Sequence, residues 1–308
     1  MKISIVSTVY CSEIFLDEFI KLTLTALKNI KCKSYEMIFV NDGSPDQSLR
    51  KLLEKRKTNK KIKILNLSRN YGHHYAIQAG LKYSTGDYVF LIDNDLEVSP
   101  LVLERLYNKL ITNKSIDVVY GYQKNRKGNF SEKLTGKLFW WLINKVSDIH
   151  IPHNLLTERL MSRRYVDKLL QLNDSNLFLG GMFHWVGFNQ TGINVIKKQR
   201  KTKSTYTFNK RTQLMVQAIT SFSSKPLMWL FNFGILVSFL SFLFIAFLCV
   251  NKIIYGDAVQ LGWTSIIAVN IFVLGLFSTF LGIVGIYLSK IFNQVQSRPN
   301  YIIKEIYE

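Results

Sequence analysis

Two long uncharged apolar segments near the C-terminus constrain the fold of this chain more than any other feature. Residues 227–250 and 263–289 contain no Asp, Glu, Lys or Arg. As a helix, the first segment would be about 36 Å long, which exceeds the roughly 30 Å hydrocarbon core of a bilayer. A buried helix of a soluble protein is the alternative, but two such segments in tandem argue against it. Tyr255, Trp263 and Tyr287 stand near the segment ends, where membrane helices carry interface aromatics. We therefore expect two transmembrane helices.

The flanking charges predict how these helices are oriented. The connection at residues 251–262 carries one Lys and one Asp, whereas Lys225, Lys290 and Arg298 lie at the outer ends. Because positively charged flanks stay in the cytoplasm, we expect both termini and the preceding domain there, and the short connection outside. Met1 leads directly into a strand-like run without an apolar leader, so no signal peptide is expected.

The chain is strongly basic, and most of its charge precedes the apolar segments. There are 40 Lys and Arg residues against 21 Asp and Glu, a formal net charge of +19. Such a surface suits an anionic partner: nucleic acid, lipid headgroups or a phosphorylated substrate. Apolar residues make up 48% of the chain, which excludes intrinsic disorder. The three cysteines form no CxxC pair, so we expect neither a disulfide framework nor structural zinc.

Two segments upstream of the membrane helices have the composition of helices that lie on a membrane surface. Residues 134–146 are apolar with Trp140, Trp141 and two lysines, and residues 214–222 carry an apolar stripe. Aromatic side chains of such helices enter the lipid while lysines reach phosphates. A core helix of the domain is the alternative for the first segment. The basic run at 197–203 adds charges that each contribute roughly 1 kcal/mol near anionic lipid.

The first part of the chain alternates strand and helix patterns. Continuous apolar runs, typical of buried parallel strands, alternate with amphipathic segments. We predict strands at residues 3–9, 36–40, 62–67, 88–92 and 117–120, and helices at residues 15–30, 46–57, 75–83 and 100–112. Ser44 is predicted to cap the second helix, with Pro45 at its first position. The pattern predicts an α/β domain with a parallel sheet covered on both faces.

Polar residues cluster where three predicted strands end, at residues 41–44, 68–70 and 93–95. Ligands of parallel sheets bind at the carboxyl ends of the strands. Asp93 and Asp95 offer hard oxygens to Mg²⁺ or Mn²⁺ and leave positions open for a diphosphate. Such a pair is usually a surface turn, but its place after an apolar strand makes it a candidate metal site. Asp42, in a Gly-Ser turn, is either a cap or an acceptor for a base N–H.

Several motifs occur together in a fixed order. They read IFVNDGSPD at 38–46, SRNYG at 68–72, AGL at 79–81, GD at 86–87, IDNDL at 92–96, LMSRR at 160–164, WVGF at 185–188, STY at 204–206 and TSFSSKPL at 220–227. Together they resemble the family-2 inverting glycosyltransferases with a GT-A (Rossmann-like) nucleotide-sugar domain. The later motifs are similar to the branch that contains dolichol-phosphate mannose synthase and the bactoprenol-phosphate glucosyltransferases. The resemblance covers nearly the whole chain.

The resemblance implies a role for each matching residue. Asp42 would hold the uracil or guanine base, while Asp93 and Asp95 would serve the metal and the diphosphate, with Asp95 favoured as the direct ligand. Arg69 and Asn70 would shape the donor pocket. Other residues expected in the nucleotide-sugar site are Tyr10, Glu13, Ser44 and Asn94. The residues expected to grip the donor diphosphate or the lipid phosphate are Arg126, Arg200, Ser204 and Tyr206. Of these, Arg126 and Arg200 are also expected to take part in catalysis, together with Asp93 and Asp95.

The sequence departs from the family pattern at a few positions. Asn41 and Gln123 stand where the family often has Asp and Arg. The run Gly-Asp-Phe-Arg before Ser-Arg-Arg reads Leu-Thr-Glu-Arg at 156–159, so the usual carboxylate is missing and Glu158 follows one place later. A hydroxyl acceptor needs a general base, normally a carboxylate, whereas a lipid phosphate is already an anion and needs positioning. The many cations beside the anchor favour a phosphate acceptor, and Glu158 stays a candidate base.

These features predict a membrane-bound inverting glycosyltransferase of the bacterial inner membrane. It would move a sugar from a nucleotide-diphosphate sugar, with a UDP-sugar favoured, to polyprenyl (undecaprenyl) phosphate. One alternative is transfer to a hydroxyl of a lipid-diphosphate-linked O-antigen or capsule intermediate. Another is a basic membrane-anchored binding protein without catalysis. We expect a homo-oligomer that does not bind nucleic acid.

The predicted organisation has four parts. They are a nucleotide-sugar domain at 1–128, an acceptor-side and juxtamembrane region at 129–226, two transmembrane helices at 227–290 and a cytoplasmic tail at 291–308. His73 and His74 are expected at a pocket or helix start rather than at a metal, because adjacent side chains diverge. Cys11 is expected to pack near the base rather than to act as a nucleophile.

Overall fold

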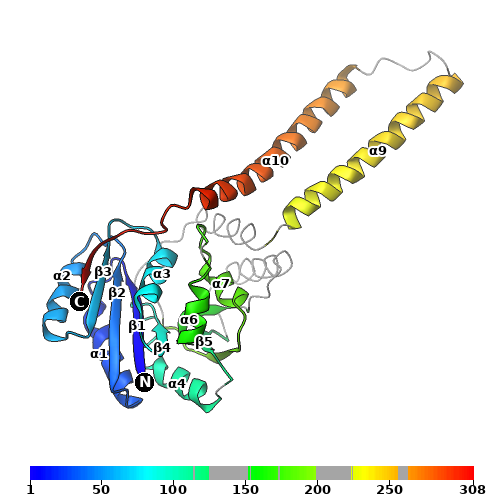
Figure 1. Ribbon diagram of the computed structural model, residues 1–308. Coiled ribbons are helices and arrows are strands. Elements are labelled where there is room, and N and C mark those ends of the chain that lie inside the picture. Colours follow the sequence, from blue (N-terminus) through cyan, green and yellow to red (C-terminus); the bar gives the residue numbers. More distant parts are fainter. Residues whose placement is uncertain are drawn as a thin grey trace.

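The computed structural model describes residues 1–113, 115–124, 152, 154–172, 174–198, 223, 225–255 and 263–308. It consists of a sheet flanked by helices, from which two long helices extend side by side (Figure 1).

Four parallel strands form the centre of the sheet. They are β1 (Lys2–Val9), β2 (Ser34–Asn41), β3 (Ile62–Leu67) and β4 (Tyr88–Leu91). Strand β1 lies between β4 and β2, and β3 follows β2. All four lie where the sequence predicts strands, and their parallel pairing confirms the predicted sheet.

The sheet is mixed rather than purely parallel. Strands β5 (Val118–Tyr122), β6 (Leu155–Ser162) and β7 (Gln190–Asn194) extend it beyond β4. Strand β6 is antiparallel to both β4 and β5, whereas β7 is parallel to β5. The sequence predicts β5 but neither β6 nor β7, because only the pairing with β4 and β5 defines them as strands.

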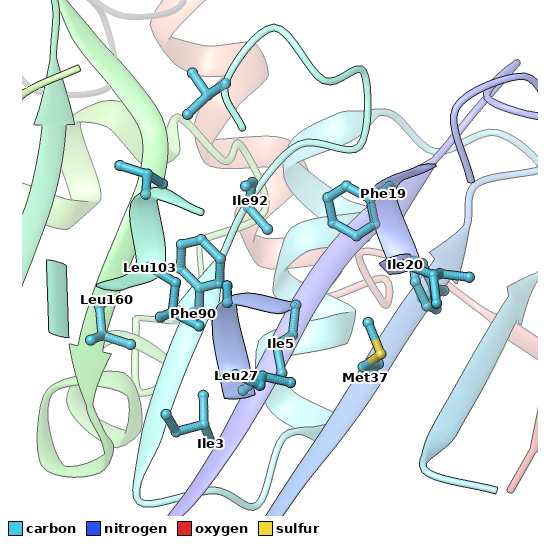
Figure 2. Packing of buried hydrophobic residues seen from close by; sticks show 14 of the residues in the cluster. Ile3, Ile5, Phe19, Ile20, Leu27, Met37, Phe90, Ile92, Leu103 and Leu160 are labelled. Carbon is cyan, nitrogen blue, oxygen red and sulfur yellow. The ribbon is translucent and has the colours of Figure 1, made fainter. Parts of the chain in front are cut away.

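Helices cover both faces of the sheet, as predicted. One face carries α1 (Leu16–Asn29), α2 (Ser48–Thr58) and α4 (Val102–Thr112), and the other carries α3 (His73–Tyr83), α6 (Arg163–Leu169) and α7 (Leu179–Trp185). Figure 2 shows the first face, where Phe19 and Ile20 of α1 and Leu103 of α4 gather with Ile5 and Phe90 of the sheet. Each such buried side chain contributes roughly 1.5–3 kcal/mol.

The second helix begins later than predicted. Helix α2 begins at Ser48 with Gln47 as its cap residue, so the prediction that Ser44 caps it is wrong. The Ser44 hydroxyl instead accepts a hydrogen bond from the Cys11 N–H at 2.7 Å and donates one to Asp46 Oδ1 at 2.6 Å. These contacts hold Ser44 in the loop, and the helix starts two residues later than predicted.

Two of the recognised motifs have structural roles away from the carboxyl ends of the parallel strands. Gly86 lies so close to β1 that a Cβ atom would come within 2.6 Å of Ser4 N. The Asp87 carboxylate accepts a hydrogen bond from Lys2 N at 2.7 Å. Arg164 pairs with Asp117 through two nitrogens and thereby joins α6 to the start of β5. These motifs therefore stabilise the domain.

Both apolar segments form helices. They are α9 (Lys225–Tyr255) and α10 (Trp263–Gln296). Among the residues whose positions are described, Val273–Gln296 has the length and composition of a membrane span, and Lys225–Val237 is a shorter apolar stretch. One candidate span is consistent with membrane association, and the two-span hairpin stays a prediction.

The C-terminal tail returns to the sheet. Strand β8 (Ile303–Tyr307) pairs antiparallel with β3, with Leu65 opposite Ile306. The Ser68 N–H donates to Ile302 O at 3.0 Å and continues this contact toward the loop after β3. Figure 1 shows the segment, in red, running from α10 back to the edge of the sheet. The end of the predicted tail is therefore an edge strand that sequence patterning does not reveal.

Candidate active site

The loops after β1, β2, β3 and β4 meet at the carboxyl ends of these parallel strands. The Ser12 hydroxyl of the first loop donates to Asn94 Oδ1 of the fourth at 3.0 Å. The Cys11 N–H of the first loop donates to the Ser44 hydroxyl of the second at 2.7 Å. These hydrogen bonds bring together the polar clusters at residues 41–44 and 93–95, at the strand ends where ligands of parallel sheets bind.

Asp42 joins the second loop to the third. Its carboxylate accepts hydrogen bonds from Tyr71 N at 2.7 Å and Gly72 N at 3.0 Å, and the residue is only 3% exposed. Gly43 allows this approach, because its φ is +62° and a Cβ atom there would lie 2.6 Å from Asn70 N. Asp42 therefore shapes the loop at 68–72. Its role toward a nucleotide base stays a prediction.

Arg69 and Asn70 lie exposed on that loop. The Arg69 guanidinium stacks over the Tyr71 ring at 4.1 Å and donates to Asn70 O at 3.2 Å. This stacking holds a cation at the edge of the site, where it is accessible to an anionic ligand. The arrangement is compatible with the predicted place of both residues in a donor pocket.

The remaining predicted donor-site residues divide into two groups. Tyr10 is 50% exposed on the first loop and is free to contact a ligand. Glu13, Ser44 and Asn94 instead connect loops: the Glu13 carboxylate accepts from Gln47 N at 3.3 Å, and Asn94 is only 4% exposed. The structure therefore places their side chains in the scaffold of the site.

Asp93 and Asp95 follow β4, with Asn94 buried between them. Asp93 Oδ1 lies 3.5 Å from Nε2 of His73, the first residue of α3, in agreement with the expected helix-start position of that histidine. Asp95 Oδ1 accepts a hydrogen bond from Glu97 N at 3.0 Å. Burial raises the pKa of Asp95, and the charges of Asp93 and Glu97 raise it further. A cation would relieve this accumulation of negative charge.

Glu158 lies next to this carboxylate turn. Strand β6 runs antiparallel to β4 with Arg159 opposite Leu91, which places Glu158 beside the start of the turn. Glu158 is 4% exposed, and its Oε2 has no hydrogen-bond partner among the described residues. Burial, and then the charge of Asp93, raise the pKa of Glu158 to about 8. Although it stands one place from the family's usual carboxylate, this residue reaches the site.

Arg159 is a buried cation behind Glu158. It is 2% exposed, its guanidinium lies 3.4 Å from the Phe183 ring centre, and its Nε donates to Thr157 O at 3.1 Å. Burial lowers the pKa of Arg159 to about 10, so the group keeps its charge at neutral pH.

Lys197 is a site residue that sequence reasoning missed. It pairs with the buried Glu97 carboxylate, two residues beyond Asp95. In the sequence it is only the first member of the basic run at 197–203, which is predicted to face lipid. The available signal was the acidic Glu97 close after the Asp pair, but no local pattern connects the two.

Four predicted residues lie outside the described part of the chain: Arg126, Arg200, Ser204 and Tyr206. The same holds for the predicted surface helices at 134–146 and 214–222. Their roles stay predictions.

The fit of a divalent cation depends on Asp93 and Asp95. Within the described ranges, no group of three or more His, Cys, Asp or Glu side chains is arranged to hold a metal ion. The two aspartates supply hard, anionic oxygens, which suit Mg²⁺ or Mn²⁺. Such an ion would take its other ligands from water and a diphosphate, in the way Mg²⁺ commonly binds.

Comparison with known proteins identifies the family. The model for glycosyl transferase family 2 matches residues 4–170, more than half of the chain. The chain belongs to glycosyl transferase family 2. The predicted enzyme class and GT-A fold are thereby confirmed, and the family favours an enzyme over a binding protein without catalysis.

Relatives in this family match along almost their whole length. The uncharacterized glycosyltransferase YkcC of Bacillus subtilis is 34% identical over 99% of this chain and 94% of its own. The SfII prophage-derived bactoprenol glucosyl transferase of Shigella flexneri is 32% identical over 99% of this chain and 98% of its own. Among solved structures, glucosyl-3-phosphoglycerate synthase from Mycobacterium tuberculosis with Mn²⁺ and UDP covers 71% of this chain at 18% identity and a TM-score of 0.48. Because this similarity is low, the candidate metal site rests on Asp93 and Asp95 of this chain alone.

Proposed function

We propose that this chain is a membrane-bound inverting glycosyltransferase that moves a sugar from a nucleotide-diphosphate sugar to polyprenyl (undecaprenyl) phosphate. The observation that carries the acceptor assignment is the similarity to the bactoprenol glucosyl transferase of Shigella flexneri, which extends over 99% of this chain. The similarity therefore includes the basic run at 197–203 and both apolar helices, which lie beyond the residues matched by the family model.

The donor would bind at the carboxyl ends of the parallel strands. In this arrangement the base lies near Asp42 and Tyr10, and the diphosphate lies near Asp93 and Asp95. A divalent cation held by the two aspartates would supply a Lewis acid that stabilises the leaving diphosphate. Arg69 adds a positive charge at the rim. A UDP-sugar is the favoured donor.

The acceptor phosphate would be held by cations rather than activated by a base. Its attacking oxygen is already ionised to a large extent, since the second pKa of a phosphate monoester is about 6. Arg126, Arg200, Ser204 and Tyr206 are the residues proposed to hold it. They precede the membrane helices in the chain, which suits a substrate whose lipid tail stays in the bilayer.

The course of the C-terminal chain supports a hairpin anchor in the bacterial inner membrane. Strand β8 follows α10 and pairs with β3 in the sheet that precedes α9. The sheet and the tail therefore lie on the same side of any membrane that these helices cross, which requires an even number of crossings. Two spans meet this requirement, with the enzyme domain and both termini in the cytoplasm. Homo-oligomer formation and the lack of nucleic-acid binding stay predictions.

The proposed function is tested with the full-length protein in lipid nanodiscs. The protein is incubated with undecaprenyl phosphate and a panel of UDP- and GDP-sugars, and the lipid product is analysed by mass spectrometry. We expect a lipid monophosphate sugar that is labile to mild acid and has inverted anomeric configuration. Transfer of the sugar only to an added lipid-diphosphate-linked glycan, with no lipid monophosphate sugar formed, would overturn the proposed acceptor.

Transfer to a hydroxyl of a lipid-linked glycan is the second candidate. It is favoured by the position of Glu158, which is buried beside Asp93 with its pKa raised to about 8. A carboxylate with a pKa near the working pH is suited to general-base catalysis. In this case a glycan acceptor, and not the lipid phosphate alone, would be consumed.

A further inference from the structure

The chain segment after β7 is held against the site at two points. Val195 is 5% exposed, and its N–H donates to Tyr122 O at 2.9 Å. The Lys198 N–H donates to Glu97 O at 2.7 Å. Between these anchors the side chains alternate, so that Ile196 is 80% exposed while Lys197 turns toward the protein. The backbone therefore directs Lys197 inward and Lys198 outward.

Lys197 reaches the carboxylates that follow β4. Its ammonium pairs with Glu97, whose side chain is 8% exposed, and the Glu97 N–H donates to Asp95 Oδ1 at 3.0 Å. Asp95 and Glu158 also lie within electrostatic range of the ammonium. The Lys197 ammonium is thus linked through Glu97 to Asp95, the aspartate favoured as the metal ligand.

Neutralising Glu97 does not by itself account for this arrangement. A buried ion pair is a weak source of stability, because apolar residues of similar volume often serve as well or better. The ammonium has three N–H donors, and the pair with Glu97 occupies one of them. The Lys197 side chain is also 36% exposed, so part of it is accessible from solvent.

We propose that Lys197 is a further catalytic residue, whose ammonium binds the leaving diphosphate of the donor while Glu97 holds it in place. This inference rests on the proposed function and deepens it. During transfer, the bond from the anomeric carbon to the diphosphate oxygen breaks, and its electron pair stays on that oxygen. The new bond forms from the acceptor oxygen to the anomeric carbon. Lys197 keeps its proton and stabilises the negative charge of the departing diphosphate.

The test compares Lys197→Met with Lys198→Met in the full-length protein. Both variants lose one lysine charge from adjacent positions, but the Lys198 side chain is exposed. UDP and GDP binding with Mg²⁺ or Mn²⁺ is measured by calorimetry, and turnover with undecaprenyl phosphate is measured in parallel. We expect Lys197→Met to bind the nucleotide roughly tenfold more weakly and to lose roughly a hundredfold in kcat/KM, the scale of one lost electrostatic stabiliser. Its KM for undecaprenyl phosphate stays the same, and Lys198→Met binds nucleotide like the wild type.

The double variant Glu97→Gln/Lys197→Gln separates binding from simple charge balance. If Lys197 binds the diphosphate, the double variant regains the thermal stability of the wild type but not its nucleotide affinity. Recovery of nucleotide affinity, or equal behaviour of Lys197→Met and Lys198→Met, would overturn the role of Lys197. Failure of the wild type to bind either nucleotide would instead overturn the proposed function, and with it this inference.

Discussion

Burial and two neighbouring carboxylates raise the pKa of Asp95, and a bound divalent cation would remove that cost. Asp95→Asn takes away one hard anionic ligand. We expect activity to fall at least about tenfold, the effect of 1.4 kcal/mol on the barrier. Initial rates with Mg²⁺, with Mn²⁺ and in excess EDTA provide the measurement. Asp167→Asn is the control, since that carboxylate is 56% exposed on α6. Undiminished turnover of Asp95→Asn, or of the wild type in EDTA, would contradict the metal site.

The two acceptor assignments predict opposite rankings for Glu158→Gln and Arg200→Ala. With a phosphate acceptor, Glu158→Gln keeps most of the activity, because the attacking oxygen needs no base. Arg200→Ala loses roughly a hundredfold or more, because it removes a cation that offsets repulsion between the two phosphates. Rates of lipid product formation measure both effects. The reverse ranking would make Glu158 the base and favour the hydroxyl acceptor.

Glu158 also makes stability depend on pH. Its pKa is raised from 4.5 to about 8, so the native state binds this proton more tightly than the unfolded chain does. The resulting stabilisation is complete below about pH 4.5 and is lost as the pH rises through about 8. Glu158→Gln cannot titrate, so its stability relative to the wild type increases between pH 5 and pH 8. Melting temperatures of both proteins in EDTA, across this range, test the trend. A constant difference would show that Glu158 does not titrate as described.

At the level of elements, β8 is the piece whose loss has the clearest consequence. Ile303 packs against the core formed by β3 and α3, whereas Ile302 is 52% exposed. We expect Ile303→Ala to cost about 1–2 kcal/mol, because its side chain is only partly buried and full burial would cost 2–5 kcal/mol. Ile302→Ala is the matched control and stays within about 0.5 kcal/mol of the wild type. Denaturation of the detergent-solubilised protein measures both. Equal effects of the two variants would mean that β8 is not packed on the sheet.

Deleting residues 303–308 removes the whole of β8. The deletion leaves β3 as an open edge, a position prone to pairing with other chains. It also removes the pairing of Ile303 with Leu67. That pairing holds the neighbouring Ile302, whose O accepts a hydrogen bond from Ser68 N–H in the loop that contains Arg69 and Asn70. Loss of β8 should therefore weaken nucleotide binding as well as stability.

For the whole molecule, the position of β8 predicts the topology of the membrane anchor. A cysteine placed at Val259, in the connection between the helices, should react with a membrane-impermeant reagent added outside cells. A cysteine at Lys57, exposed on α2, should react only after the membrane is opened. Both are made in a variant without Cys11, Cys32 and Cys249. Labelling at position 259 from the cytoplasmic side alone would rule out the hairpin.

Local patterning determined the core of the fold from the sequence alone. The strand predicted at 62–67 is found at Ile62–Leu67, and the one predicted at 3–9 is found at Lys2–Val9. Both segments are predominantly apolar, and their burial on both faces of a parallel sheet follows from that composition. Asp93 and Asp95 were recognised for a related reason, because a polar pair after an apolar strand is a local signal. The enzyme family followed from motifs of the same kind.

Only the tertiary structure decided which distant groups meet. The five residues of β8 have no distinctive pattern, and their pairing with β3 joins positions more than 230 residues apart. Glu158 reaches Asp93 because β6 runs antiparallel to β4, and Lys197 reaches Glu97 because β7 pairs with β5. Ser44 accepts a hydrogen bond from Cys11 N–H in the loop after β1 instead of capping α2, because β1 and β2 are neighbours in the sheet. Strand partners and the partners of buried charges are set by contacts across the sheet, and periodicity along the chain does not encode such contacts.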